Sequence, residues 1–332
     1  MRHSQEPRAA MLSLVVSCLA ACCLAGQPAP VPAPVAAPAY KAQLGIPFCK
    51  VVGKELKLNA FLPENADKPA PAMVEIHGGW WCGGGPARKV ENIAGWQTFT
   101  RKGIALFPIS YRLGKEGGFP QNIRDCRNAI RFLRRNAQRF NIDPEHIGCM
   151  GISAGGQLSL MVAMVPEEFD DGGPTEELKG ISASVCNAFA IVAPTDLVRQ
   201  WDEAPRDEIP EFDGTVRLRP PDGRIPDDAR PHHRILFKGI TPDTEECKAL
   251  YTRMSPIGHV RKDISPLLIC DGEKDTIVPG LHGKALHEKL QAVGADSTYW
   301  LTPNGGHGYP GGKGFQKVLD DFLTRTLELG AQ

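Results

Sequence analysis

Three residues that lie far apart in the sequence have the types and the order that nucleophilic catalysis needs. Ser153 lies in GISAG (151–155), Asp275 in DGEKDTIVPG and His307 in PNGGHGYP. A serine hydroxyl attacks when a base takes its proton, and a histidine base needs an acid to orient its ring. The pattern therefore predicts Ser153 as the nucleophile, His307 as the base and Asp275 as the acid.

The residues around Ser153 favour this role. The apolar run HIGCMGIS (146–153) leads directly into AGGQLSLMVAMV (154–165), which has the small and apolar residues of a packed helix. A serine on the tight turn between a strand and a helix is exposed at the edge of a sheet, and the flanking glycines allow that turn. The alternative is an ordinary glycine-rich turn without chemistry.

The acid has one close competitor. Asp271 belongs to the same segment as Asp275 but lies nearer to the expected strand, where a carboxylate would only cap the turn. We therefore expect Asp275 to be the acid. For His307 the alternative is a loop histidine without a role.

The segments between these residues alternate between strand and helix patterns. Expected strands cover 71–79, 103–111, 146–153, 190–197, 266–273 and 297–303. Expected helices cover 119–140, 154–165, 280–295 and 314–329. Apolar strands separated by crossover helices predict an α/β fold with a mostly parallel central sheet and helices on both faces. Successive parallel strands end at one edge of the sheet, so the loops of the three residues should meet there.

One region departs from this alternation. Residues 198–248 are rich in proline and in charges of both signs, and we expect them to form a lid-like insertion within a single catalytic domain (44–330). A second departure is the loop HGGWWCGGG (77–85). It is a linker, a phosphate cradle or a loop that brings backbone N–H groups to a reacting carbonyl. A cradle needs a following helix with a lysine or a ribose-binding acid, and neither is evident.

Together these motifs resemble an α/β-hydrolase of the esterase/lipase group. The chain is similar to the hormone-sensitive-lipase-like carboxylesterases, and more closely to their acetyl-xylan and feruloyl esterase-like members. The matching segments span about 46–325, except for the insertion, and include AMVEIHGGWW, ISYRL, GISAGGQLSLMVA, APTDL, MSPIGHV, DGEKDTIVP and GGHGY. The resemblance implies an α/β-hydrolase fold and a Ser153–His307–Asp275 triad, with no metal or organic cofactor.

The resemblance also implies an oxyanion hole. The family has a His-Gly-Gly-Gly loop that supplies backbone N–H groups, and here Gly78 and Gly79 occupy the matching positions, with Ala154 as the further donor after the nucleophile. Trp80 stands where the third glycine is usual, which would put a bulky ring beside the acyl pocket.

Substrate contacts are expected from three aromatic residues near this loop. They are Trp80, Trp81 and Tyr111. Tyr111 follows an expected strand end, and packing against the oxyanion loop is its alternative role. Asn59 stands where relatives often have aspartate, and we expect its role to be structural.

The charge balance argues against a nucleic-acid partner. Lys and Arg number 38 and Asp and Glu also number 38, whereas nucleic-acid-binding proteins usually carry a basic excess. The segment RNAIRFLRRNAQRF (127–140) is locally basic. Its apolar residues have the spacing of a buried helix face, so we expect its arginines to form the solvated face.

The N-terminal segment predicts export. Residues 1–25 contain two arginines before a short apolar run, as in a secretory signal, and the run ends in LAAC, which resembles a lipobox with Cys22 as the lipidated residue. Ordinary cleavage near residue 25 is the alternative. Residues 26–43 are rich in proline and alanine and should form an extended linker. We expect a periplasmic or cell-surface lipoprotein, or a secreted protein.

The cysteines outside the export segment show no regular framework. Cys149 and Cys270 lie in apolar runs and should be buried small hydrophobic residues. The sequence leaves open whether one or two disulfides form among the cysteines.

The sequence as a whole predicts an exported serine esterase that acts on small-molecule or polysaccharide-linked esters, of acetyl-xylan or feruloyl type. An arylformamidase and a prolyl-oligopeptidase-like peptidase are the enzymatic alternatives. A non-catalytic anchored binding protein on a hydrolase fold is the third. A lipid anchor would tie the protein to a membrane, and the oligomeric state stays open.

Overall fold

The computed structural model describes residues 40–64, 66–165, 169–203, 208–210, 216–218 and 244–329. The expected export segment (1–25), most of the expected linker (26–43) and much of the expected insertion (198–248) lie outside the described residues.

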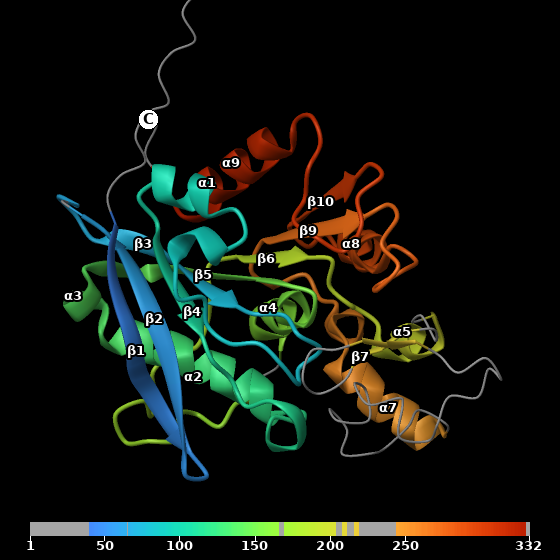
Figure 1. Cartoon of the computed structure of the whole chain (residues 1–332), viewed down its shortest axis with the longest axis horizontal. Helices are drawn as coiled ribbons and strands as arrows, with labels where there is room; N and C mark the ends of the chain where they lie inside the picture. The colour runs from blue at the N-terminus through green and yellow to red at the C-terminus, as the bar shows by residue number, and fades with distance from the viewer. Residues whose placement is uncertain are drawn as a thin grey trace, which may run out of the picture. The chain divides into compact units, whose positions relative to one another are not determined.

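A sheet of eight strands forms the centre of the described chain (Figure 1). The strands are β1 (Tyr40–Val51), β2 (Lys54–Pro63), β3 (Ala70–Ile76), β4 (Ala105–Ile109), β5 (Ile142–Ile152), β6 (Ala188–Ile191), β9 (Leu267–Gly272) and β10 (Ser297–Thr302). Their order is β1-β2-β4-β3-β5-β6-β9-β10. All pairs from β4 to β10 are parallel, and the β1–β2 and β2–β4 pairs are antiparallel. The expected mostly parallel sheet of an α/β-hydrolase is confirmed.

Helices cover both faces of this sheet (Figure 1). On one face lie α1 (Trp96–Arg101) and α9 (Phe315–Thr326). On the other lie α2 (Gln121–Arg135), α3 (Ala137–Phe140), α4 (Ala154–Met164), α5 (Leu197–Glu203), α7 (Glu245–Met254) and α8 (His282–Ala292). Successive strand residues point to opposite faces, so Met73 of β3 joins the first layer and Val74 the second. Burial of both faces explains why the inner strands are continuous apolar runs.

The antiparallel hairpin of β1 and β2 was not among the expected strands. β1 begins at Tyr40, which pairs with Pro63, so the folded domain begins before the expected boundary at residue 44. The register of the hairpin shifts between Gln43 and Ile46 and again between Pro47 and Cys49. Such bulges interrupt the alternation of side chains that marks a strand in a sequence.

Within the expected insertion, the structure describes α5, α7 and two short antiparallel strands, β7 (Glu208–Pro210) and β8 (Val216–Leu218).

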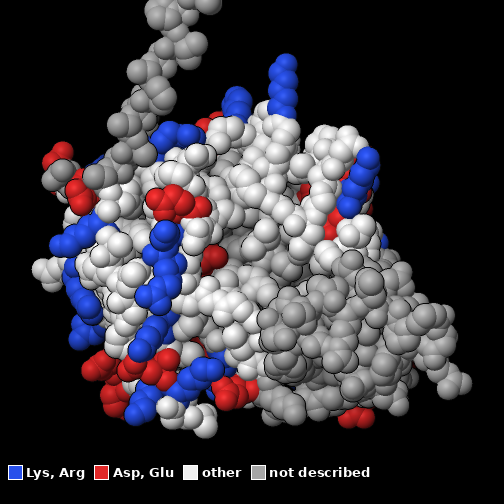
Figure 2. Space-filling view, viewed as in Figure 1, with Lys and Arg blue, Asp and Glu red and all other residues white. Residues whose placement is uncertain are grey.

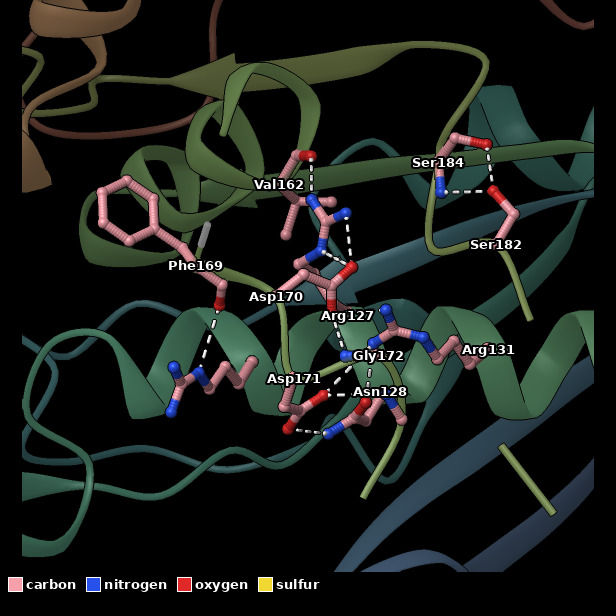
Figure 3. Close-up of polar contacts among 12 residues, drawn as sticks. Arg127, Asn128, Arg131, Val162, Phe169, Asp170, Asp171, Gly172, Ser182 and Ser184 are labelled. Carbon is pink, nitrogen blue, oxygen red and sulfur yellow. Dashed lines mark hydrogen bonds and ion pairs between the residues drawn. The ribbon is translucent and has the colours of Figure 1, made fainter. Parts of the chain in front are cut away.

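The expectation of a solvated arginine face over 127–140 holds for Arg135 and Arg139, which are exposed, but is wrong for two arginines of α2. Arg127 and Arg131 are only 7% and 2% exposed. Both form ion pairs with Asp170, which lies in the segment after α4, and Figure 3 shows the two guanidinium groups pointing at this segment. Arg131 also donates to the carbonyl oxygen of Ile181 at 2.9 Å. The pattern on the helix itself could not reveal acids that lie far away in the sequence.

The surface carries both signs of charge in close proximity. On the face in Figure 2, positive and negative side chains intermingle, and ion pairs such as Lys54–Glu116 and Lys57–Glu55 join them. In the described part of the chain, no helix has the length and apolar character needed to cross a bilayer.

The cysteines of the described residues are all free thiols. Cys149 and Cys270 are buried, as expected, and so are Cys49 and Cys126.

Candidate active site

Ser153 lies on a strained turn between β5 and α4. Its φ of 57° and ψ of −124° fall in a region that residues other than glycine rarely adopt. Its N–H donates to the carbonyl oxygen of Ile191 at 2.8 Å, which ties the turn to β6. A Cβ on Gly155 would lie 1.9 Å from the carbonyl oxygen of Ile76. Only glycine therefore lets the helix start so close to β3, as the sequence context around the serine predicted.

Asp275 and His307 are joined by a hydrogen bond. Oδ2 of Asp275 lies 2.8 Å from Nδ1 of His307. Oδ1 accepts from the N–H groups of Ile277 and Val278 at 2.8 and 3.0 Å, so the carboxylate is held on both sides. Since a carboxylate only accepts, the proton belongs on Nδ1, and Nε2 of the histidine is left as a proton acceptor.

The loops that carry these two residues are also joined to each other. The N–H of Asn304 donates to Oε2 of Glu273 at 2.7 Å, and the N–H of Lys274 donates to the carbonyl oxygen of Gly305 at 2.7 Å. The loops follow β9 and β10, which are parallel neighbours. Hydrogen bonding between the two loops thus continues past the strand ends and sets the spacing of Asp275 and His307.

Asp271, the competing acid, caps a helix. It accepts from the N–H groups of Gly283 and Lys284 at the start of α8, at 3.1 and 2.9 Å, and from the Tyr299 hydroxyl at 3.0 Å. Burial raises the pKa of this carboxyl above its ordinary value. All of its described partners are structural, which agrees with the preference for Asp275.

Two further carboxylates, Asp125 and Asp196, have structural contacts as well. Asp125 on α2 pairs with Arg112 through its side chain, at 2.8 Å, and with the Arg112 N–H at 2.9 Å. Asp196 accepts from the Arg199 N–H at 3.1 Å and caps α5.

Gly78 brings its backbone, without a side chain, close to Ser153. A Cβ on Gly78 would lie 3.5 Å from Cβ of Ser153 and 2.9 Å from the carbonyl oxygen of Ile152. Among the described hydrogen bonds, none is donated by the backbone N–H groups of Gly78 or Gly79. Ala154 opens α4, and the first N–H groups of a helix have no acceptor within it. Three candidate donors therefore surround the serine turn.

The same loop then turns sharply. The carbonyl oxygen of Gly79 accepts from the N–H groups of Cys82 and Gly83, at 3.0 and 2.9 Å. Gly79, Trp80 and Trp81 have positive φ angles of 104°, 54° and 60°. Glycine adopts such angles freely, but the two tryptophans do so only when their surroundings hold them.

Tyr111 packs against the first residue of this loop, His77. It is 2% exposed, its hydroxyl donates to the carbonyl oxygen of His77 at 3.0 Å, and its ring stacks on the His77 ring at 4.4 Å. Burial lowers the pKa of His77, which keeps this imidazole neutral. Packing against the loop was the alternative role of Tyr111, and the contacts agree with it.

The three expected substrate contacts therefore differ from one another. Trp81 is 1% exposed and packs in the core, as Tyr111 does. Trp80 is only partly buried. Of the three, Trp80 is therefore the one whose side chain is not fully buried.

Two further polar residues bond to the loop of residues 77–85 or to the segment that follows it. Asn59 accepts from the Gly45 N–H in β1 and donates to the carbonyl oxygen of Ala87, and these contacts agree with the structural role expected for it. Gln157 was not singled out. The only signal was an amide in an otherwise small and apolar helix, one turn after Ser153.

No group of three or more His, Cys, Asp and Glu side chains within the described residues is arranged to hold a metal ion.

Comparison with known proteins identifies a family that matches this chain. The BD-FAE family model matches residues 58–290, which is more than half of the chain. Esterase LipC of Mycobacterium tuberculosis is 26% identical over 243 residues, covering 73% of this chain and 54% of LipC. The acetylxylan esterase of Xylanibacter ruminicola is 34% identical over 109 residues, covering 32% of this chain and 22% of that protein. The chain thus spans about half or less of the length of these two relatives.

A solved structure supports the fold. A truncated form of carbohydrate esterase from gut microbiota superposes with a TM-score of 0.68 at 24% identity, covering 87% of this chain and 98% of the other. At this identity the likeness concerns the α/β-hydrolase fold alone.

Proposed function

The chain belongs to the BD-FAE family, and from this membership we propose that it is a serine esterase that cleaves carboxylic esters through an acyl-enzyme. The observation that carries the proposal is the hydrogen bond between Asp275 and His307, which leaves the second ring nitrogen of the histidine as a base. Ser153, on its strained turn at the end of β5, is the proposed nucleophile.

In the proposed reaction, Nε2 of His307 takes the proton of the Ser153 hydroxyl as its oxygen attacks the ester carbonyl carbon. Asp275 keeps the imidazole oriented and stabilises its charged form. The tetrahedral intermediate collapses when His307 gives the proton to the leaving alcohol oxygen. Water, deprotonated by the same nitrogen, then attacks the acyl-enzyme and releases the acid and free Ser153.

The negative oxygen of the intermediate is held, in this proposal, by the backbone N–H groups of Gly78, Gly79 and Ala154. Support comes from the closeness of Gly78 to Ser153 and from the unused N–H groups of the loop. Donors that are fixed before the reaction are effective, and one of them is typically worth about 2.7–4 kcal/mol in the transition state.

The proposed substrates are small or carbohydrate-linked esters of acetyl-xylan or feruloyl type. The local similarity to an acetylxylan esterase supports this class. Trp80, which is partly exposed next to Gly79, would narrow the acyl side of the site or stack on a sugar or aromatic group.

The direct test is hydrolysis of p-nitrophenyl acetate by the wild type and by Ser153→Ala. We expect the variant to lose almost all of the hydrolytic activity. Equal rates would contradict the proposed esterase activity and favour the alternative of a binding protein on a hydrolase fold. Acetylated xylan, feruloyl esters, N-formylkynurenine and a proline-containing peptide, compared side by side, would then separate the esterase from the arylformamidase and the peptidase.

Export and lipidation at Cys22 are proposed on the sequence alone. Mass spectrometry of the mature N-terminus tests them, because an unmodified start at any other residue contradicts the lipoprotein.

A further inference from the structure

The side chain of Gln157 joins three separate parts of the fold. Gln157 is fully buried on α4, where its backbone N–H donates to the carbonyl oxygen of Ser153 at 3.0 Å. Its Oε1 accepts from the indole N–H of Trp81 at 3.0 Å. Its Nε2 donates to the carbonyl oxygen of Met254, the last residue of α7, at 2.7 Å. One amide therefore links the nucleophile's helix, the glycine-rich loop and the end of α7.

The chemistry of the partners sets the direction of this amide. An indole N–H only donates and a backbone carbonyl only accepts, so Oε1 must face Trp81 and Nε2 must face Met254. Leucine at position 157 would have similar volume but neither bond. The buried indole N–H and the Met254 carbonyl would then both lose their described partner.

Trp81 belongs to the part of the loop whose backbone is under strain. Its φ of 60° follows the positive φ angles of Gly79 and Trp80. Its carbonyl oxygen accepts from the Gly114 N–H at 2.9 Å, and its ring is almost fully buried. A strained backbone keeps its conformation only when neighbouring groups hold it. The hydrogen bond and the packing that hold the Trp81 indole therefore restrain the conformation of the loop that begins at Gly78.

We propose that Gln157 is a positioning residue for the oxyanion hole, an inference that rests on the proposed function. By holding the Trp81 indole, it sets where the N–H groups of Gly78 and Gly79 lie relative to Ser153, which starts the same helix. Misplaced donors bind the oxyanion of the transition state less well but bind the neutral substrate almost equally. Loss of the amide should therefore lower kcat and change KM little.

The test measures kcat and KM for p-nitrophenyl acetate in Gln157→Leu, Trp81→Phe and the double variant. Titration with a fluorophosphonate counts the competent serines, so that kcat refers to folded enzyme. We expect each single change to lower kcat per titrated site roughly 10- to 100-fold, a part of what the loss of a whole donor costs. The double variant should be no slower than the slower single variant, because both changes break the same bond.

Ser159→Ala is the matched control on the same helix. Ser159 is fully buried, its hydroxyl donates to the carbonyl oxygen of Gly155 at 2.8 Å, and no described hydrogen bond of this hydroxyl reaches the loop of residues 77–85. We expect wild-type kcat per titrated site. If Gln157→Leu does not fold, Trp81→Phe still tests the bond, because phenylalanine keeps the aromatic packing and removes the N–H.

Three results would overturn the inference. They are wild-type kcat per titrated site in the variants, a change confined to KM, and fully additive losses in the double variant. The Ser153→Ala control runs in the same assay. If its rate equals that of the wild type, the proposed function fails and the inference fails with it; if it is inactive, any of the three results counts against the role of Gln157 alone.

Discussion

Asp275 accepts the hydrogen bond of His307 Nδ1 at 2.8 Å while two backbone N–H groups hold its other oxygen. Asp271, four positions earlier in the same segment, is instead occupied by the start of α8 and by Tyr299. The two aspartates thus have separate contacts, because Asp271 still belongs to β9 and only Asp275 lies beyond the strand end and within reach of His307.

Asp275→Asn should lower kcat roughly 10⁴-fold, because an amide does not fix the tautomer that leaves Nε2 of His307 as a base. The measurement is ester hydrolysis per folded molecule. Asp271→Asn is the control and should lose thermal stability while it keeps kcat near that of the wild type. If the two variants exchange these effects, the assignment of the acid is wrong.

Gly155→Ala should disrupt the turn that carries Ser153. The added Cβ would lie 1.9 Å from the carbonyl oxygen of Ile76 and 2.7 Å from that of His77, so β3 or α4 must move. We expect a large loss of stability and of titratable serine. A Cβ on Gly85, in the separate glycine-rich loop of residues 77–85, would meet nothing within 4 Å. Gly85→Ala should therefore stay within about 0.5 kcal/mol of the wild type in a denaturation experiment.

Arg131→Ala should destabilise the fold by about 1.5–3 kcal/mol, since it removes one buried cationic partner of Asp170 and leaves the pair with Arg127. The measurement is urea denaturation followed by circular dichroism. Arg135 lies exposed on the same helix, and Arg135→Ala should change the free energy of unfolding by no more than about 0.5 kcal/mol. Equal losses in the two variants would contradict a buried ion-pair network beneath residues 169–184.

Glu75 should make the stability depend on pH. Burial in β3 raises the pKa of this carboxyl from 4.5 to about 8. Between these values the folded protein binds a proton that the unfolded chain releases, so the free energy of unfolding falls as pH rises, by up to about 1.4 kcal/mol per pH unit. Glutamine does not titrate, so the Glu75→Gln variant should lack this contribution to the pH dependence of the free energy of unfolding.

The melting temperatures of the wild type and Glu75→Gln, compared at pH 5, 6.5 and 8, test this dependence. The variant should gain stability relative to the wild type at each step. Glu55 is exposed and pairs with Lys57, so Glu55→Gln should show no such trend. A constant difference between wild type and Glu75→Gln would contradict the raised pKa.

Much of the site could be predicted because it depends on local sequence. A strand of apolar residues, a glycine-flanked serine and a small-residue helix are contiguous, and each step restricts the backbone of the next. The strand ends that carry Asp275 and His307 follow from the same alternation of elements, since parallel strands bring their loops to one edge. The positions of β5, α4, β9 and β10 agree with the expected ones to within a few residues.

Other features needed the tertiary structure because their partners lie far away in the chain. Nothing near α2 in the sequence shows that Asp170 would cover Arg127 and Arg131. The burial of Trp81 and the exposure of Trp80 depend on a turn of the loop and on an acceptor, Gln157, that comes 76 residues later.

The sequence by itself determined the fold class, the parallel sheet and the strand-end segments that carry Ser153, the two aspartates and His307, because short-range periodicity and turn chemistry encode them. Only the tertiary structure decided which aspartate contacts His307, which aromatic rings reach the surface and which amide holds the glycine-rich loop. Those choices depend on side chains that meet only after the sheet has formed, and local sequence carries no record of such contacts.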